Sequence, residues 1–180
     1  VVQARVQVIS PDGGNVAPTD AMWKVGPGEP FFYSNGQFSL DASRGYHRIL
    51  VERGTEYTPW QKTIEVDGSS DSVIDIQLDR WADLPDRGWH PGNTHIHYRE
   101  TETRPDDRLR LDPRIEDLRM TAVSILKRWD LEYATNKYAP GMLTEFSSAH
   151  HYVQCGEENR HNALTSHGIG YGHIMLLNIR

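Results

Sequence analysis

The feature that most constrains the fold is a succession of short alternating segments in the first eighty residues. Each segment carries apolar side chains at every second position and ends at a turn cluster rich in Gly, Pro, Asn or Asp. Such segments predict strands with one buried face, because successive side chains of a strand point to opposite faces. About seven strands at this spacing predict a small all-β sandwich over residues 1–80. The predicted strands cover residues 2–9, 21–25, 31–33, 37–40, 46–52, 60–66 and 72–78.

One local signal in this half is especially strong. Asn35-Gly36 stands between the segments 31–33 and 37–40, and Asn and Gly accept the positive φ angles that a tight hairpin turn needs. The sequence therefore predicts a hairpin across this turn. His47 alternates with apolar neighbours, and we interpret it as a residue of the strand surface, not as a ligand.

The pattern changes beyond residues 81–92, a connector rich in proline, glycine and charge that we interpret as a linker. Short apolar runs follow, separated by helical or polar sequence. Uninterrupted apolar runs are typical of strands that are covered on both faces, as in parallel sheets. Residues 93–180 are therefore expected to begin a β/α domain. The runs cover residues 122–126, 152–155 and 173–179.

A helix is predicted ahead of the second strand of this domain. Asp112 can cap the helix and Pro113 suits its first turn. Ile115 and Leu118 continue the helical spacing. Residues 99–110 are polar throughout and are predicted to form an exposed loop.

Composition excludes several classes of protein. The net charge is −6, with acidic and basic residues interspersed, so no broad basic face for nucleic acid is expected. No apolar run approaches the roughly 18 residues of a membrane span, so no transmembrane segment is expected. Cys155 is the only cysteine, which rules out an internal disulfide. We interpret it as a small buried apolar residue and not as a nucleophile.

Histidines are concentrated in the second half, since only His47 of the nine precedes residue 90. His95 and His97 are separated by one residue of a short alternating segment. In a strand the two imidazoles would project side by side from one face. Imidazole is the commonest metal ligand in proteins, so the pair indicates a metal site. A single pair of this kind also occurs on ordinary polar strand surfaces. Further ligand residues are therefore needed to identify a metal site.

Further candidate ligands lie at predicted strand ends. Glu157 and Glu158 follow the strand 152–155, and His173 opens the last strand. In β/α domains the chemistry collects at the carboxyl ends of the strands, a rule that His173 fits less well than the glutamates. Alternation places Glu157 and Glu158 on opposite faces, so at most one can reach a shared site, and spacing leaves open which. A bridging carboxylate with imidazoles from different strands is what a two-metal hydrolytic site needs.

Two stretches of the first half form a recognisable pattern: the turn and strand Asn35-Gly36-Gln37-Phe38, and the Gly45-Tyr46 pair ahead of an apolar strand. With them the first half resembles the carboxypeptidase-regulatory-like, transthyretin-like sandwich. Sandwiches of this family serve as packing or recognition modules, and we expect no chemistry in this half.

The second half resembles the PHP (polymerase and histidinol phosphatase) metal-dependent hydrolases. The matching motifs, in order, are the segment from Trp89 to His97, Gly156-Glu157-Glu158, and Gly172-His173. A sandwich placed before such motifs resembles the carbaryl-hydrolase-type (CehA/McbA-like) branch. The resemblance implies an α+β two-domain chain, in which the sandwich is followed by the first part of a distorted (β/α)7 barrel.

The resemblance also implies a ligand set. His95 and His97 would bind one metal ion, Glu158 would bridge two ions, and His173 would bind the second. The ions would be divalent zinc, manganese or iron, with two or more in the full-length protein. The implied reaction is hydrolysis of a small-molecule phosphoester, or of another ester or amide, by metal-activated water.

Other residues near the expected rim are candidates for catalysis and substrate contact. We expect Glu158 and His161 to take part in catalysis, with His161 as a proton donor. Arg99 and Arg160 are the candidates for contact with an anionic substrate. Exposed loop residues of these types are commonly solvated side chains without a role in catalysis.

The chain departs from the family pattern at three points. Asn93 stands where the family often has Asp, and Asp130 is the nearest substitute for a missing Thr-Asp-His element. The chain also stops at Arg180, before the later strands that supply further ligands in the family. We therefore expect a fragment with an open barrel edge, able to mediate oligomer contacts, and a poor catalyst by itself.

Two other functions remain open at this stage. One is a recognition protein whose PHP-like domain has lost catalysis, and the other is an amidohydrolase, which also begins with His-x-His on a first strand. An extracytoplasmic location, periplasmic or secreted, is expected only from the family-like sandwich.

Overall fold

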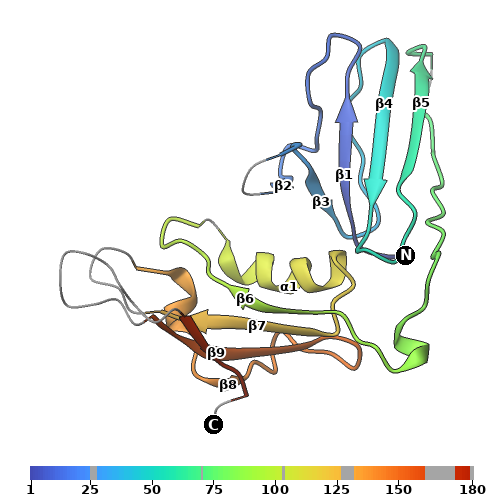
Figure 1. Cartoon of the computed structure of the whole chain (residues 1–180). Coiled ribbons are helices and arrows are strands. Elements are labelled where there is room, and N and C mark those ends of the chain that lie inside the picture. Colours follow the sequence, from blue (N-terminus) through green and yellow to red (C-terminus); the bar gives the residue numbers. More distant parts are fainter. Residues whose placement is uncertain (25–27, 70, 103, 127–131, 161–172, 179–180) are drawn as a thin grey trace. The chain divides into compact units, whose positions relative to one another are not determined.

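A computed structural model describes the whole chain except residues 25–27, 70, 103, 127–131, 161–172 and 179–180, and except the side chains of Arg160 and His173. The described part is a mixed α+β structure, mostly strands, with two sheets and a single α-helix (Figure 1). The chain divides into two compact units. The first comprises Val1–Trp89 with Arg114–Asp117, and the second comprises His90–Pro113 with Leu118–Arg180.

The first unit holds a five-stranded antiparallel sheet in the order β2-β3-β1-β4-β5 (Figure 1). Its apolar face forms a core around Val6 and Phe32, each 1% exposed, together with Val8 and Val51. The strands are β1 (Ala4–Ile9), β2 (Met22–Trp23), β3 (Phe32–Ser34), β4 (Gly45–Glu52) and β5 (Trp60–Val66).

Two predicted strands of this unit, residues 37–40 and 72–78, are not strands in the structure. The predicted hairpin at Asn35-Gly36 is therefore wrong, and β3 pairs with β1 and β2 instead. The alternating side chains of both segments still turn toward the core, since Leu40 and Ile76 pack against it. Alternation in the sequence thus predicted which side chains are buried, but it did not predict whether the backbone pairs with a neighbouring strand. The described residues of this unit form one sheet, and a sandwich is not confirmed.

The prediction for His47 is also wrong. The side chain lies on the apolar face of β4 and the residue is 2% exposed. Its Nδ1 lies 3.3 Å from the carbonyl oxygen of Gly45. Histidine is intermediate in its burial preference, so the alternation of β4 should have outweighed its polarity.

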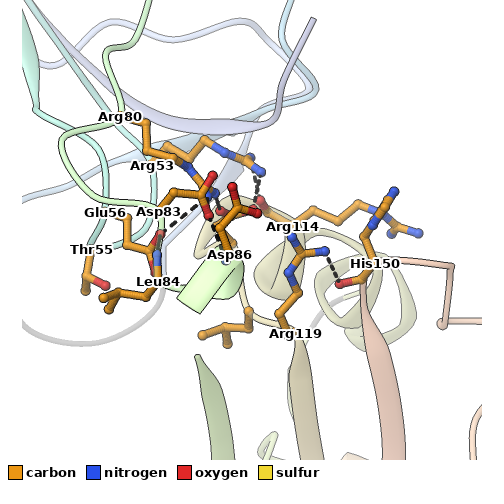
Figure 2. Close-up of polar contacts among 12 residues, drawn as sticks. Arg53, Thr55, Glu56, Arg80, Asp83, Leu84, Asp86, Arg114, Arg119 and His150 are labelled. Atoms are coloured by element: carbon orange, nitrogen blue, oxygen red, sulfur yellow. Dashed lines mark hydrogen bonds and ion pairs between the residues drawn. The ribbon is translucent and has the colours of Figure 1, made fainter. Parts of the chain in front are cut away.

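Charged contacts hold the start of the expected linker on the first unit (Figure 2). Arg80 pairs with Glu56 at 3.3 Å and with Asp83 at 3.0 Å, and it also contacts Asp117. Asp117 accepts a hydrogen bond of 2.7 Å from Arg53. A short 3-10 helix, η1 (Pro85–Arg87), follows.

The second unit holds the other sheet, in the order β10-β9-β7-β6, with β8 paired to β9 (Figure 1). β6, β7 and β9 are parallel, whereas β8 and β10 run antiparallel to β9. The expectation of parallel strands is therefore wrong for β10, because an apolar run does not encode strand direction. The strands are β6 (Gly92–Ile96), β7 (Met120–Ile125), β8 (Gly141–Met142), β9 (Tyr152–Arg160) and β10 (His173–Leu176).

The helix of this unit begins earlier than predicted. α1 spans Pro105–Ile115, so much of the predicted loop 99–110 is helical. A proline at the first position followed by acidic residues is a helix start signal that the search at Asp112 overlooked. The residues of α1 are largely charged, but Leu109 is fully buried in the core of this unit. In the described part of the chain, no helix is long and apolar enough to cross a membrane.

Candidate metal centre

His95 and His97 lie at the end of β6, where the strand is irregular. The register between β6 and β7 shifts between Asn93 and Ile96. The side-chain oxygen of Asn93 accepts a hydrogen bond of 3.0 Å from the backbone N–H of His95. Asn93 therefore shapes the backbone at the first histidine, and its amide oxygen serves this purpose as a carboxylate would.

Glu158 enters the same region from β9. Its side chain is 0% exposed, while the neighbouring Glu157 is exposed. This is the alternation expected of adjacent residues in a strand. Gly156, two residues earlier, has no room for a side chain, because a Cβ there would lie 2.3 Å from the carbonyl oxygen of Leu176.

The three side chains converge on one point. The Nε2 atom of His95 lies 3.1 Å from Oε2 of Glu158, and Nε2 of His97 contacts the same oxygen. One ligand atom from each residue falls within 4.8 Å of the others, so this group could hold a metal ion. The imidazole rings meet edge to face with centroids 5.0 Å apart. Two nitrogens and one oxygen thus lie close enough together to share one ion.

A backbone carbonyl fixes the orientation of the His97 ring. Nδ1 of His97 lies 3.0 Å from the carbonyl oxygen of Ser124 in β7. Because a carbonyl oxygen only accepts hydrogen bonds, Nδ1 is the donor. This hydrogen bond turns Nε2 toward Glu158, where it could bind a metal ion. Metal-binding histidines are commonly oriented in this way.

Sequence reasoning missed the residues that surround His97. The ring of Tyr133 packs against His97 with centroids 4.9 Å apart. The hydroxyl of Thr135 donates to the Ser124 carbonyl at 3.0 Å. Tyr133 immediately precedes the 3-10 helix η2 (Ala134–Lys137), which follows β7, and Thr135 lies within it. The only available signal was that a segment at the carboxyl end of a parallel strand often contributes to a site.

Other predicted site residues are not tested by side-chain geometry. His173 in β10 pairs through its backbone with Arg160 in β9. Two residues along the same pair of strands, Met175 pairs with Glu158. The side chains of His173 and Arg160 lie outside the described structure, as do His161 and Asp130 as whole residues.

Arg99, His150 and Cys155 are described but lie outside this group. Arg99 is exposed, and its backbone forms a bridge with Tyr133. His150 is exposed, and its carbonyl oxygen lies 3.4 Å from Arg119 (Figure 2). Cys155 is fully buried in the core, where burial raises the pKa of the thiol to about 11. This agrees with its interpretation as a buried apolar residue.

Comparison with known proteins adds no relative. No protein-family model, curated protein or solved structure matches the chain. We therefore infer the function from the geometry of His95, His97 and Glu158.

Proposed function

We propose that this chain carries the metal centre of a metal-dependent hydrolase of the PHP type. The observation that supports the proposal is the convergence of the His95 and His97 Nε2 atoms on one oxygen of Glu158. Two imidazoles and a carboxylate are suitable ligands for zinc, manganese and iron. The orientation of His97 by the Ser124 carbonyl fits the same purpose.

The exposure of the three ligands favours a catalytic site over a structural one. Catalytic zinc sites have three protein ligands and leave a position for water, while structural sites have four protein ligands. The side chain of His95 is 46% exposed, that of His97 is 10% exposed and that of Glu158 is buried. Solvent therefore reaches the group from the His95 side.

The chain would contribute binding and orientation. When bound, the ion would supply Lewis acidity and lower the pKa of a coordinated water molecule. His95 and His97 would hold the ion through Nε2, and Glu158 would hold it through Oε2. In the proposal His173 binds a second ion, His161 donates a proton to the leaving group, and Arg99 and Arg160 contact a small anionic ester.

The fold assignments remain part of the proposal. The parallel order of β6, β7 and β9, with α1 between the first two, supports the start of a PHP-type barrel. The first unit would be the sandwich-type recognition module of an extracytoplasmic protein. Ile174 and Leu176 in β10 have exposed apolar side chains. This exposure supports the proposal that the edge strand β10 contacts another polypeptide segment, such as a second subunit.

A recognition protein with a non-catalytic metal site is the second candidate. One observation favours it: among the described residues, His95, His97 and Glu158 are the only group of three possible metal ligands, whereas the proposed two-metal chemistry needs more. Both candidate functions predict that the chain binds a metal ion, but only the hydrolase predicts turnover of a substrate.

The first test is metal content. Elemental analysis of the purified chain should find zinc, manganese or iron in a stoichiometric amount, and the metal should be lost in His95→Ala/His97→Ala. His150→Ala, which removes an exposed imidazole outside the group, should retain the metal. Absence of metal from the wild-type chain after incubation with each ion would overturn the proposal.

The second test is turnover. The metal-loaded chain should hydrolyse p-nitrophenyl phosphate, its diester or the acetate ester faster than the same metal in buffer. The rate should fall to the buffer value in His97→Ala. Stoichiometric metal without turnover on any of the three ester classes would refute hydrolysis by this chain and favour the non-catalytic candidate.

A further inference from the structure

The carbonyl oxygen of Ser124 accepts two hydrogen bonds. One comes from Nδ1 of His97 and the other from the hydroxyl of Thr135, each at 3.0 Å. A carbonyl oxygen has two lone pairs, so both donors can be accommodated without competition. The two donors together occupy the acceptor and restrict the orientation of the peptide plane.

Burial makes this arrangement costly to disturb. Ser124 and Thr135 are each 0% exposed, so water cannot replace a missing donor without entering the core. A hydrogen bond inside a protein is also stronger than one in water. The hydroxyl of Thr135 therefore acts on the same acceptor that orients His97.

The segment that carries Thr135 is anchored on both sides. The side-chain amide of Asn136 bonds both the N–H and the carbonyl of Leu126, each at 2.9 Å. The backbone N–H of Ala134 donates to the carbonyl of Tyr98 at 2.8 Å. Thr135 is thus held between β7 and the residues just after His97.

From these contacts we propose that Thr135 is a positioning residue for His97. It acts through the Ser124 carbonyl, which it holds in the orientation that accepts the hydrogen bond from Nδ1 of His97 and so keeps Nε2 turned toward Glu158. The metal part of the inference rests on the proposed function, while the orientation of the His97 ring concerns the metal-free chain alone.

The test compares two substitutions at this position with a matched control. Thr135→Val removes the hydroxyl at almost constant volume, and Thr135→Ser keeps it. Thr121→Val is the control, because Thr121 lies in β7, is 0% exposed, and its hydroxyl has no hydrogen-bond partner among the described residues. If Thr135→Val fails to fold by circular dichroism, Thr135→Ala replaces it.

The first measurement is affinity for Co²⁺ or Zn²⁺ by competition titration. Removing a direct partner of a metal ligand costs 10–100-fold in affinity, and Thr135 acts one residue further away. We therefore expect Thr135→Val to weaken binding by about threefold to tenfold. Thr135→Ser should restore most of the loss, and Thr121→Val should bind as the wild type does.

The second measurement is the Nδ1–H signal of His97 by long-range ¹H–¹⁵N NMR of the metal-free chain. The wild type and Thr135→Ser should show a slowly exchanging proton on Nδ1, and in Thr135→Val this proton should exchange faster with solvent, because the Ser124 carbonyl is no longer held in place. A Thr135→Val chain with wild-type affinity and an Nδ1–H that exchanges as slowly as in the wild type would overturn the inference. If the wild type binds no metal, the proposed function fails, and the NMR comparison alone decides this inference.

Discussion

Metal binding should stabilise one unit of the chain and not the other. All three ligands belong to the second unit, and the first unit contributes none. A ligand that binds only the folded state at 100 times its Kd adds about 2.7 kcal/mol to the free energy of unfolding. For a domain of about 60–100 residues, 1 kcal/mol shifts Tm by about 4–8 °C. Saturating Zn²⁺ should therefore raise the Tm of the second unit by about 10–20 °C.

Hydrogen exchange followed by mass spectrometry can distinguish the two units. Peptides from β7 and β9 should exchange more slowly after Zn²⁺ is added to the metal-free chain. Peptides from β1 and β4 should exchange at an unchanged rate. Glu158→Gln should lose the effect, because the amide has the same shape without the negative charge. Glu157→Gln, the exposed neighbour, should keep it.

Two results would refute this reasoning. Equal protection of both units would show that the ion acts elsewhere or through general effects on the chain. Full protection in Glu158→Gln would show that the ion does not use this carboxylate.

Three further predictions concern the side chains around the site and the core. Because burial raises the pKa of the Cys155 thiol to about 11, a thiol reagent at neutral pH should label it only in denaturant. The hydrogen bond from Lys137, with a smaller contribution from Tyr138, holds the pKa of Asp106 below its ordinary value. The contact stabilises the folded state fully when the pH is above the ordinary pKa of an aspartate. This stabilisation is lost as the pH falls through the lowered pKa of Asp106 in the folded state. Asp106→Asn should thus reduce the acid sensitivity of urea unfolding. Thr121→Val should raise the free energy of unfolding by up to about 1 kcal/mol, because it removes a buried hydroxyl without a partner in the described structure; urea titration would check this.

The sequence predicted the elements whose signals are local. Five of the strands expected in the first half appear, because alternation reflects the burial of one face. The segment 72–78 alternates as clearly and buries Ile76 against the core, yet it forms no strand. Strand formation also requires that the backbone pair with a neighbouring strand, and the alternation of a single segment does not encode that pairing.

The same limit applies to the metal centre. The pairing of His95 with His97 and the separation of Glu157 from Glu158 follow from the two-residue period of a strand, and the sequence contains that period. The contribution of Thr135 does not follow from any period, because it depends on a turn after β7 that brings a hydroxyl back to the Ser124 carbonyl.

The role of Asn93 differs between what its motif position suggests and what the structure shows. An asparagine in place of an aspartate would be expected to orient a neighbouring histidine less well. In the structure the residue accepts a hydrogen bond from the backbone of His95, which an amide oxygen does without a charge. Compared with an aspartate, Asn93 therefore lacks one negative charge near the ligands but keeps this hydrogen bond. A weaker attraction for cations, with the arrangement of His95 and His97 preserved, is the expected consequence.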